Sequence, residues 1–386
     1  DNTASWDITP TNYYTYRGPL IEEARTNLLP YTNLQTGWNL NNAPTMTYDT
    51  AVAPDGTLTA VTIEDPTGNT YKTIVETVGT TVNLKHAFSI FVRKEVSETA
   101  YSGMGIQASG GTSQVAYAIV DAVNGTVVIA PASTLTDAAA TIEDFNSDWW
   151  RLHVTATDTG SNTDVNMSYY GTLSTNGTSV DVGVGSPRTI WGPQIEVGGA
   201  VSSFIPSTAG AAVTRNADNL YYDADQWWNS NGGTIQVDYE RLIPTAGTTY
   251  GRANTQVFRF ARAGAYTFDN QFTLGRTSNK EAISFRDIDG TGVDLANAYI
   301  SEVTSKLLTH RAAVAWGDGV AGSHNGEASY AISPAESTKV TFDILSLSHA
   351  YDGKVGAKYI LNVIYYQKRL ANSVIEANSA REYSND

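Results

Sequence analysis

Short runs in which apolar and polar residues alternate follow one another along most of this sequence. Alternation with a period of two places successive side chains on opposite faces of a β-strand. The first group of such runs covers 58–63, 86–93, 115–120, 126–129, 150–156 and 165–170. These runs predict a strand-rich structure from Arg25 onward.

The segments between these runs carry residues that favour turns. Asn124-Gly125 and Asn176-Gly177 each separate two strand-like runs. Asn-Gly is a strong hairpin signal, because both central residues of a type I′ turn need a positive φ. Many short strands joined by such turns, with little helical periodicity, predict a β-sandwich or barrel.

A stretch of small residues interrupts the pattern at 206–212. A second group of strand-like runs follows at 233–241, 257–261, 266–274, 281–286, 310–316, 339–347 and 358–366, and a helical pattern is confined to 371–381. We therefore predict an all-β chain of two tandem β-sandwich domains, with no internal repeat. The predicted boundaries are an extended lead-in over 1–25, a first domain over 26–206, a linker over 207–215 and a second domain over 216–386.

The composition agrees with this fold class and excludes some partners. Hydrophobic residues make up 41% of the chain and charged residues 16%, which suits a folded core and not a disordered chain. Asp and Glu outnumber Lys and Arg by 39 to 24, and a net charge of −15 repels phosphate backbones and anionic lipid surfaces. We expect no nucleic-acid partner and, without a run of 18 apolar residues, no membrane insertion.

Residue patterns typical of catalysis are missing from the sequence. There is no cysteine, which excludes disulfides, thiolate metal sites and cysteine nucleophiles. The five histidines stand singly, without an H-x-H or H-E-x-x-H pattern, and neither G-x-S-x-G nor a phosphate-binding loop occurs. Asp238 and Glu240 share a strand face, but a solvated strand edge explains that pair more simply than a two-acid glycosidase site. We expect no catalytic residue and no enzymatic activity.

Acidic turns suggest one metal. Ca²⁺ binds carboxylate and carbonyl oxygens, and Asp287 and Asp289, in a turn-like segment, are weak candidate ligands. The segment 318–325 has a similar composition, and EF-hand spacing does not occur. Structural calcium is the only cofactor that the sequence suggests.

Aromatic residues are the other chemical resource, with 8 Trp and 22 Tyr. Sugar rings have apolar C–H faces that stack on exposed aromatic rings. In Trp149-Trp150 and Trp227-Trp228, adjacent side chains point to opposite strand faces, so one ring of each pair can be buried and the other exposed. The alternative is that most of these rings fill the two cores.

The best candidate for a glycan site is the predicted loop 318–325, which follows Trp316. It would combine the Trp316 ring with hydrogen bonds from Asp318, His324 and Asn325 to sugar hydroxyls. The alternative interpretation is an ordinary hydrated hairpin loop.

The first predicted domain carries an ordered set of distinctive strings. It opens with G-P-L-I-E-E-A-R-T-N-L-L at 18–29 and Gly37-Trp38, and closes with I-W-G-P-Q-I-E-V-G at 190–198 and S-F-I-P-S-T at 203–208, running into A-V-T-R-N-A-D at 212–218. Between them lie A-P-D-G-T at 53–57 and W-W-R-L at 149–152. Together these strings resemble a domain of bacteriophage tail and other virion proteins, although 1–17 do not match the segment expected upstream of it. Such domains are similar to jelly-roll carbohydrate-binding modules.

The second predicted domain is similar to the laminin-G or concanavalin-like sandwich that often follows in those virion proteins. The matching strings lie at 228–229, 233–235, 310–316, 325–327 and 364–370. In both resemblances the matching tryptophans look like scaffold positions, not a shared ligand site. They are Trp149, Trp191, Trp228 and Trp316.

The resemblance implies a non-enzymatic virion protein, on the tail or in a surface fibre, located outside the cell and binding host-surface polysaccharide. Its expected partners are other virion proteins and further copies of itself in a closed homo-oligomer, most often a trimer. The aromatic stretch 6–16 would then order against a neighbouring subunit or another virion protein. Two alternatives stay open, a purely structural decoration or collar protein and a polysaccharide depolymerase or lyase.

Overall fold

The computed structural model of the chain divides into two compact units. It describes residues 20–22, 24–65, 72–96, 101–173, 187–218, 221–224, 227–229, 231–241, 255–261, 271–277, 280–286, 296–302, 309–317, 320–325, 330–332, 344–347 and 358–380. We call Ala24–Asn216 the first sandwich, and Asp1–Glu23 together with Ala217–Asp386 the second sandwich. The chain therefore begins in the second sandwich, passes into the first and returns.

The elements of each unit are almost all strands. The first sandwich contains β2 (Arg25–Asn27), β3 (Asn39–Asn41), β4 (Thr45–Thr47), β5 (Val61–Glu64), β6 (Thr73–Gly79), β7 (Lys85–Arg93), β8 (Tyr101–Ser109), β9 (Gln114–Asp121), β10 (Thr126–Ile129), β11 (Thr136–Asp144), β12 (Trp149–Thr157), β13 (Asp164–Leu173), β14 (Arg188–Val197) and β15 (Val213–Arg215). The second contains β1 (Leu20–Ile21), β16 (Tyr221–Asp223), β17 (Gly233–Arg241), β18 (Thr255–Ala261), β19 (Gln271–Thr277), β20 (Lys280–Arg286), β21 (Ala296–Glu302), β22 (Thr309–Trp316), β23 (Val320–His324), β24 (Tyr330–Ile332), β25 (Ile344–Ser346), β26 (Lys358–Tyr366) and α1 (Asn372–Ser379).

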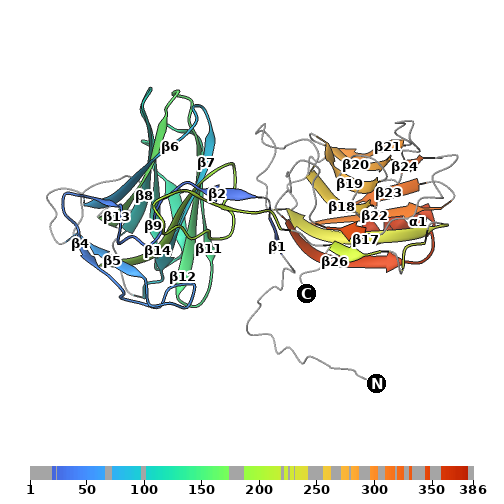
Figure 1. The fold of residues 1–386 in the computed structure, drawn as a ribbon, viewed down its shortest axis with the longest axis horizontal. Coiled ribbons are helices and arrows are strands. Elements are labelled where there is room, and N and C mark those ends of the chain that lie inside the picture. The colour runs from blue at the N-terminus through green and yellow to red at the C-terminus, as the bar shows by residue number, and fades with distance from the viewer. Residues whose placement is uncertain are drawn as a thin grey trace, which may run out of the picture. The chain divides into compact units, whose positions relative to one another are not determined.

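The first sandwich packs two six-stranded antiparallel sheets face to face (Figure 1). Sheet I has the order β10-β9-β8-β13-β6-β3 and sheet II the order β11-β12-β7-β14-β5-β4. Alternate residues of β7 and β12, such as Phe88, Ile90 and Leu152, point into the buried core between the sheets. The sequence pattern at 86–93 and 150–156 reflects this inward and outward alternation.

The second sandwich has the same two-layer plan. Sheet III has the order β1-β26-β17-β22-β23-β24, and sheet IV has the order β16-β25-β18-β19-β20-β21. Ile235, Val237 and Val314 of sheet III and Phe258 and Phe260 of sheet IV belong to one buried core. The chain is therefore all-β with two sandwich units, as the sequence predicts.

The Asn124-Gly125 hairpin is present, but its turn differs from the expected type I′ geometry. β9 and β10 are joined with Asp121 opposite Thr126, and Gly125 has a φ of 63°. Asn124 keeps a negative φ, and its backbone N–H donates to Asp121 Oδ1 at 3.1 Å. The Asp121 side chain therefore organises the turn, so only glycine needs the left-handed conformation. Asn176-Gly177 lies outside the described residues.

The predicted linker 207–215 contacts the first sandwich. Ser207 is buried and its Oγ donates to the carbonyl oxygen of Leu29 at 2.6 Å. β15 pairs with β2, with Val213 opposite Asn27. The predicted helix at 371–381 is present as α1. None of the helices among the described residues is long and apolar enough to cross a membrane.

Candidate functional site

Trp316, the aromatic member of the predicted glycan site, has its ring in the core of the second sandwich. Only 3% of the residue is exposed. Its ring stacks on Trp228 with centroids 4.5 Å apart at 11°, and its Nε1 donates to the carbonyl oxygen of Asn229 at 2.9 Å. Trp149 and Trp191 are buried too, as expected of scaffold residues.

The segment predicted as a glycan-binding loop is mostly a strand. Residues 320–324 form β23, which pairs with β22 through the backbone, with Ala321 opposite Ala315. His324 is buried, and its Nε2 lies 3.1 Å from Nδ1 of His310. Asn325 accepts a hydrogen bond from the backbone N–H of Arg311 at 2.8 Å, which closes the end of the β22–β23 pair.

The described members of the predicted site do not meet in one cluster. His324 lies opposite Ala312, four positions before Trp316 along β22. At about 3.4 Å per residue, that separates the two positions by roughly 14 Å. Asp318 lies outside the described residues. Glycan contact by these residues stays a prediction.

Calcium binding also stays a prediction. The weak candidates Asp287 and Asp289 lie outside the described residues. In the part of the chain that the structure describes, no group of three or more His, Asp or Glu side chains could hold a metal ion.

Trp149 and Trp150 do point to opposite faces of β12, but Trp149 is buried and the half-buried ring of Trp150 has Lys94 over it. Trp149 packs on the outer side of sheet II, and its Nε1 donates to the carbonyl oxygen of Val52 at 3.1 Å. Trp150 packs against the core, with Lys94 Nζ 4.1 Å from its ring centroid. The expected exposed aromatic platform is therefore not at this pair.

Sheet I carries a different aromatic cluster on its outer face. Ser168 on β13, Gly105 on β8 and Tyr117 on β9 lie side by side in one row across three strands. The next row along the strands contains Asn166 and Gln107, directly opposite each other. The ring of Tyr170 lies next to Gly105 and completes this surface. We call the surface the tyrosine face, and it consists of Gly105, Gln107, Tyr117, Asn166, Ser168 and Tyr170.

Gly105 lets two tyrosine rings approach the backbone of β8. A Cβ at this position would lie 2.9 Å from Cε2 of Tyr170 and 3.3 Å from Cε1 of Tyr117. The rings meet edge to face, with centroids 6.2 Å apart and an interplanar angle of 75°. Tyr170 is buried and Tyr117 is half-buried, so Tyr170 holds in place a ring that solvent reaches.

Neutral hydrogen-bonding groups lie beside these rings. Gln107 is exposed, and its Oε1 accepts a hydrogen bond from Asn166 Nδ2 at 3.2 Å. Its Nε2 donates to Ser113 Oγ at 3.1 Å. These contacts hold the two amides in fixed positions next to Tyr117, while Ser168 offers a partly exposed hydroxyl.

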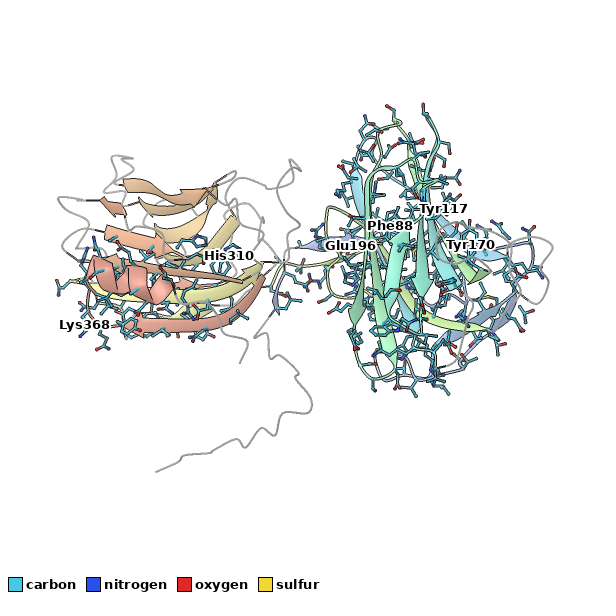
Figure 2. The ribbon with its side chains drawn as sticks, turned by 180° about the vertical axis from the view of Figure 1, so that it is seen from behind. Phe88, Tyr117, Tyr170, Glu196, His310 and Lys368 are labelled. Carbon is cyan, nitrogen blue, oxygen red and sulfur yellow. The ribbon has the colours of Figure 1, made fainter. Side chains whose placement is uncertain are left out.

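The outer face of sheet II is covered by its own chain. Glu196 is fully buried, and its carboxylate accepts hydrogen bonds from Ser202 N at 2.9 Å and from Ser202 Oγ at 2.6 Å. Arg151 donates to the carbonyl oxygen of Ser202 at 2.8 Å. In Figure 2, Tyr117 and Tyr170 lie on one side of the core residue Phe88, and Glu196 lies on the other side.

The tyrosine face can therefore offer one aromatic ring flanked by amide and hydroxyl groups, with no charged side chain among its six residues. That combination suits a sugar ring, which has apolar C–H faces and hydroxyl edges. Sequence reasoning missed this face, because alternation in β9 did not say which side of the sheet stays open. The available signal was Gly103 and Gly105 at alternate positions, since glycine inside a strand often marks a close approach to the backbone.

The sequence matches no protein-family model and no curated protein. Similar solved structures include the CBM40 module of Ruminococcus gnavus IT-sialidase bound to α2,3-sialyllactose. It is 16% identical over 42% of this chain and 92% of that chain, with a TM-score of 0.33. Trypanosoma rangeli sialidase in complex with the inhibitor DANA is 9% identical over 82% of this chain and 60% of that chain, with a TM-score of 0.29. Mouse laminin α1 domains LG4-5 are 12% identical over 80% of this chain and 88% of that chain, with a TM-score of 0.26.

Proposed function

We propose that this chain is a non-enzymatic bacteriophage virion protein, on the tail or in a surface fibre, that binds host-surface glycan through the tyrosine face. The ordered strings at both ends of the first sandwich support the virion assignment. In this proposal the protein acts outside the cell, in a closed homo-oligomer with other virion proteins as partners.

The tyrosine face is the observation that carries the glycan-binding part. Its half-buried Tyr117 ring supplies a surface for stacking, and Gln107 and Asn166 supply amides that both donate and accept hydrogen bonds. A sugar hydroxyl also donates and accepts, so these amides can pair with it in either role.

The test is binding to an array of purified capsular polysaccharides, lipopolysaccharide O-chains and teichoic acids. We expect Tyr117→Ala and Gln107→Ala each to weaken binding of the recognised polysaccharide about tenfold, which corresponds to about 1.4 kcal/mol. Matched controls are Tyr48→Ala and Gln35→Ala, because both residues are exposed in the first sandwich but lie outside the tyrosine face. Wild-type binding by Tyr117→Ala and Gln107→Ala would remove the tyrosine face from the proposal.

The virion assignment has a separate test. Gold-labelled antibody against this chain should decorate the tail or surface fibres of particles released by the strain that encodes it. Labelling of a collar or capsid by a protein that binds no polysaccharide would favour the structural alternative. Release of oligosaccharides from a bound polysaccharide would overturn the non-enzymatic assignment and favour a depolymerase or lyase.

A further inference from the structure

The outer face of sheet III holds a pocket beside the single described helix of the second sandwich. Its volume is about 260 Å³, and its walls come from β17, β22, β26 and α1. The lining residues are Gln236, Arg311, Asn362, Ile364, Tyr366 and Asn378. None of them belongs to the tyrosine face or to the site predicted from the sequence.

The pocket exists because α1 covers only part of this sheet face. Ile375 of α1 packs on Ala313 and Ala315 of β22 and on Ala321 of β23, where alanines let the helix approach closely. Figure 2 shows α1 lying across these strands. Over β17 and β26 the same face carries larger side chains, among them Gln236, Ile364 and Tyr366, and the hollow lies beside the helix at these residues.

The charge in the pocket wall is balanced within the protein. Asp238 on β17 is buried, and its Oδ1 and Oδ2 accept hydrogen bonds from Arg311 Nε at 2.6 Å and Nη2 at 2.8 Å. Arg311 Nη1 also donates to the carbonyl oxygen of Asn378 at 3.4 Å. This two-pronged ion pair fixes the guanidinium and cancels its charge, so the wall gives little net attraction to an anion.

The remaining lining groups are neutral and fit a polyhydroxylated ring. Gln236, Asn362 and Asn378 carry amides that both donate and accept hydrogen bonds, and Tyr366 and Ile364 add half-buried apolar surface. A volume of about 260 Å³ is below the roughly 300–1,000 Å³ of sites for drug-sized ligands, so it suits one sugar ring better than a chain of them.

We propose that this pocket is a second carbohydrate site, which takes one uncharged monosaccharide unit and discriminates against acidic sugars. The inference goes beyond the tyrosine face, because it concerns the other sandwich and holds or fails independently of binding there.

The experiment uses the full chain and methyl glycosides of glucose, galactose, mannose and N-acetylglucosamine as neutral probes. Glucuronate and sialic acid are the acidic probes. Binding is followed by saturation-transfer NMR and by calorimetric titration. We expect at least one neutral glycoside to bind, and Asn362→Ala and Tyr366→Ala each to weaken that binding at least tenfold. Asn231→Ala is the matched control, because it removes an exposed asparagine of the same sandwich that does not line the pocket.

The outcomes separate this site from the tyrosine face. Neutral-glycoside binding that survives Asn362→Ala and Tyr366→Ala but is lost in Tyr117→Ala would overturn the pocket while leaving the proposed function intact. Preferential binding of glucuronate or sialic acid, or no binding of any probe, would also overturn it. Melting temperatures of all variants within about 2 °C of the wild type would exclude unfolding as the cause of lost binding, because such a shift corresponds to no more than about 1 kcal/mol.

Discussion

Trp191 closes the outer face of sheet II by packing among other aromatic rings. Its ring centroid lies 5.4 Å from that of Phe91 and 4.4 Å from that of Phe204, and its Nε1 donates to Thr59 Oγ1 at 3.1 Å. We expect Trp191→Ala to lower the free energy of unfolding by about 3–5 kcal/mol, because removing a buried ring leaves a cavity. Urea titration followed by circular dichroism measures this loss.

Trp191→Phe serves as the control, since it keeps a ring in place and loses the hydrogen bond to Thr59. It should cost less than the alanine variant. A Trp191→Ala protein with wild-type stability but no glycan binding would show that this tryptophan belongs to a binding site and not to the scaffold.

The lowered pKa of His153 predicts that the protein loses stability in acid. Burial lowers its pKa to about 3, and the charge of Arg151 acts in the same direction. An unfolded histidine titrates near 6.5, so between these values the unfolded chain binds more protons. This contribution to stability is complete above about pH 6.5 and is lost as the pH falls toward 3.

Between pH 6.5 and pH 3, we expect the free energy of unfolding to fall by about 1–3 kcal/mol less in His153→Gln than in the wild type. This figure is smaller than the full pKa shift would give, because the imidazole is partly exposed to solvent. The imidazole is 25% exposed and its Nε2 lies 3.6 Å from Glu143 Oε2. Free energies of unfolding at several pH values, for the variant and the wild type, measure the difference. Parallel curves over this range would show that His153 is not the titrating group.

At the scale of elements, the packing of three strands around a glycine positions the tyrosine face. Ser168, Gly105 and Tyr117 are direct neighbours across β13, β8 and β9. A methyl group at position 105 would push both tyrosine rings away from β8, although its backbone is an ordinary strand. The geometry of the face therefore depends on a residue with no side chain of its own.

We expect Gly105→Ala to weaken polysaccharide binding at least fivefold, because the rings must move, while most of the fold is kept. The matched control is Gly79→Ala in β6 of the same sheet, where an added Cβ has no heavy atom within 4 Å. The array assay and thermal melts measure both effects. Equal binding by the two variants would show that the ring positions do not matter for recognition.

At the scale of the molecule, β1 ties the beginning of the chain to its end. Leu20 lies opposite Tyr359 and Ile21 opposite Lys358, so an N-terminal segment forms the edge of sheet III. The backbone N–H of Glu22 then donates to Asp218 Oδ2 at 2.8 Å. These contacts join two segments of the second sandwich between which the whole first sandwich is inserted.

We expect deletion of residues 1–21 to destabilise the second sandwich by about 1–3 kcal/mol, through lost strand pairing and apolar burial, and to leave the first unchanged. Calorimetry should show that the transition of the second sandwich shifts alone. Deletion of residues 1–17 keeps β1 and should not shift it. A fall in solution mass for both deletions would support the predicted intersubunit role of 6–16, and an unchanged mass would contradict it.

The sequence by itself determined the fold class and part of the strand pattern. In β12 buried residues that face the core alternate with half-buried residues on the other face, so alternation is visible in the sequence. β14 is buried along almost its whole length, because the outer face of sheet II is also covered, and it shows no alternation that a sequence could reveal. β8 was missed because its glycines and small residues look like a turn.

The tertiary structure alone decided which surfaces are open. Trp316 and Tyr117 both lie in strands that the alternation predicted, yet the first ring is enclosed and the second is half-buried. A period of two assigns side chains to two faces, but what covers each face comes from segments far away in the sequence, such as Phe204 on sheet II or α1 on sheet III. The candidate binding surfaces follow from those long-range contacts, because a residue is available to a ligand only where no distant part of the chain packs on it.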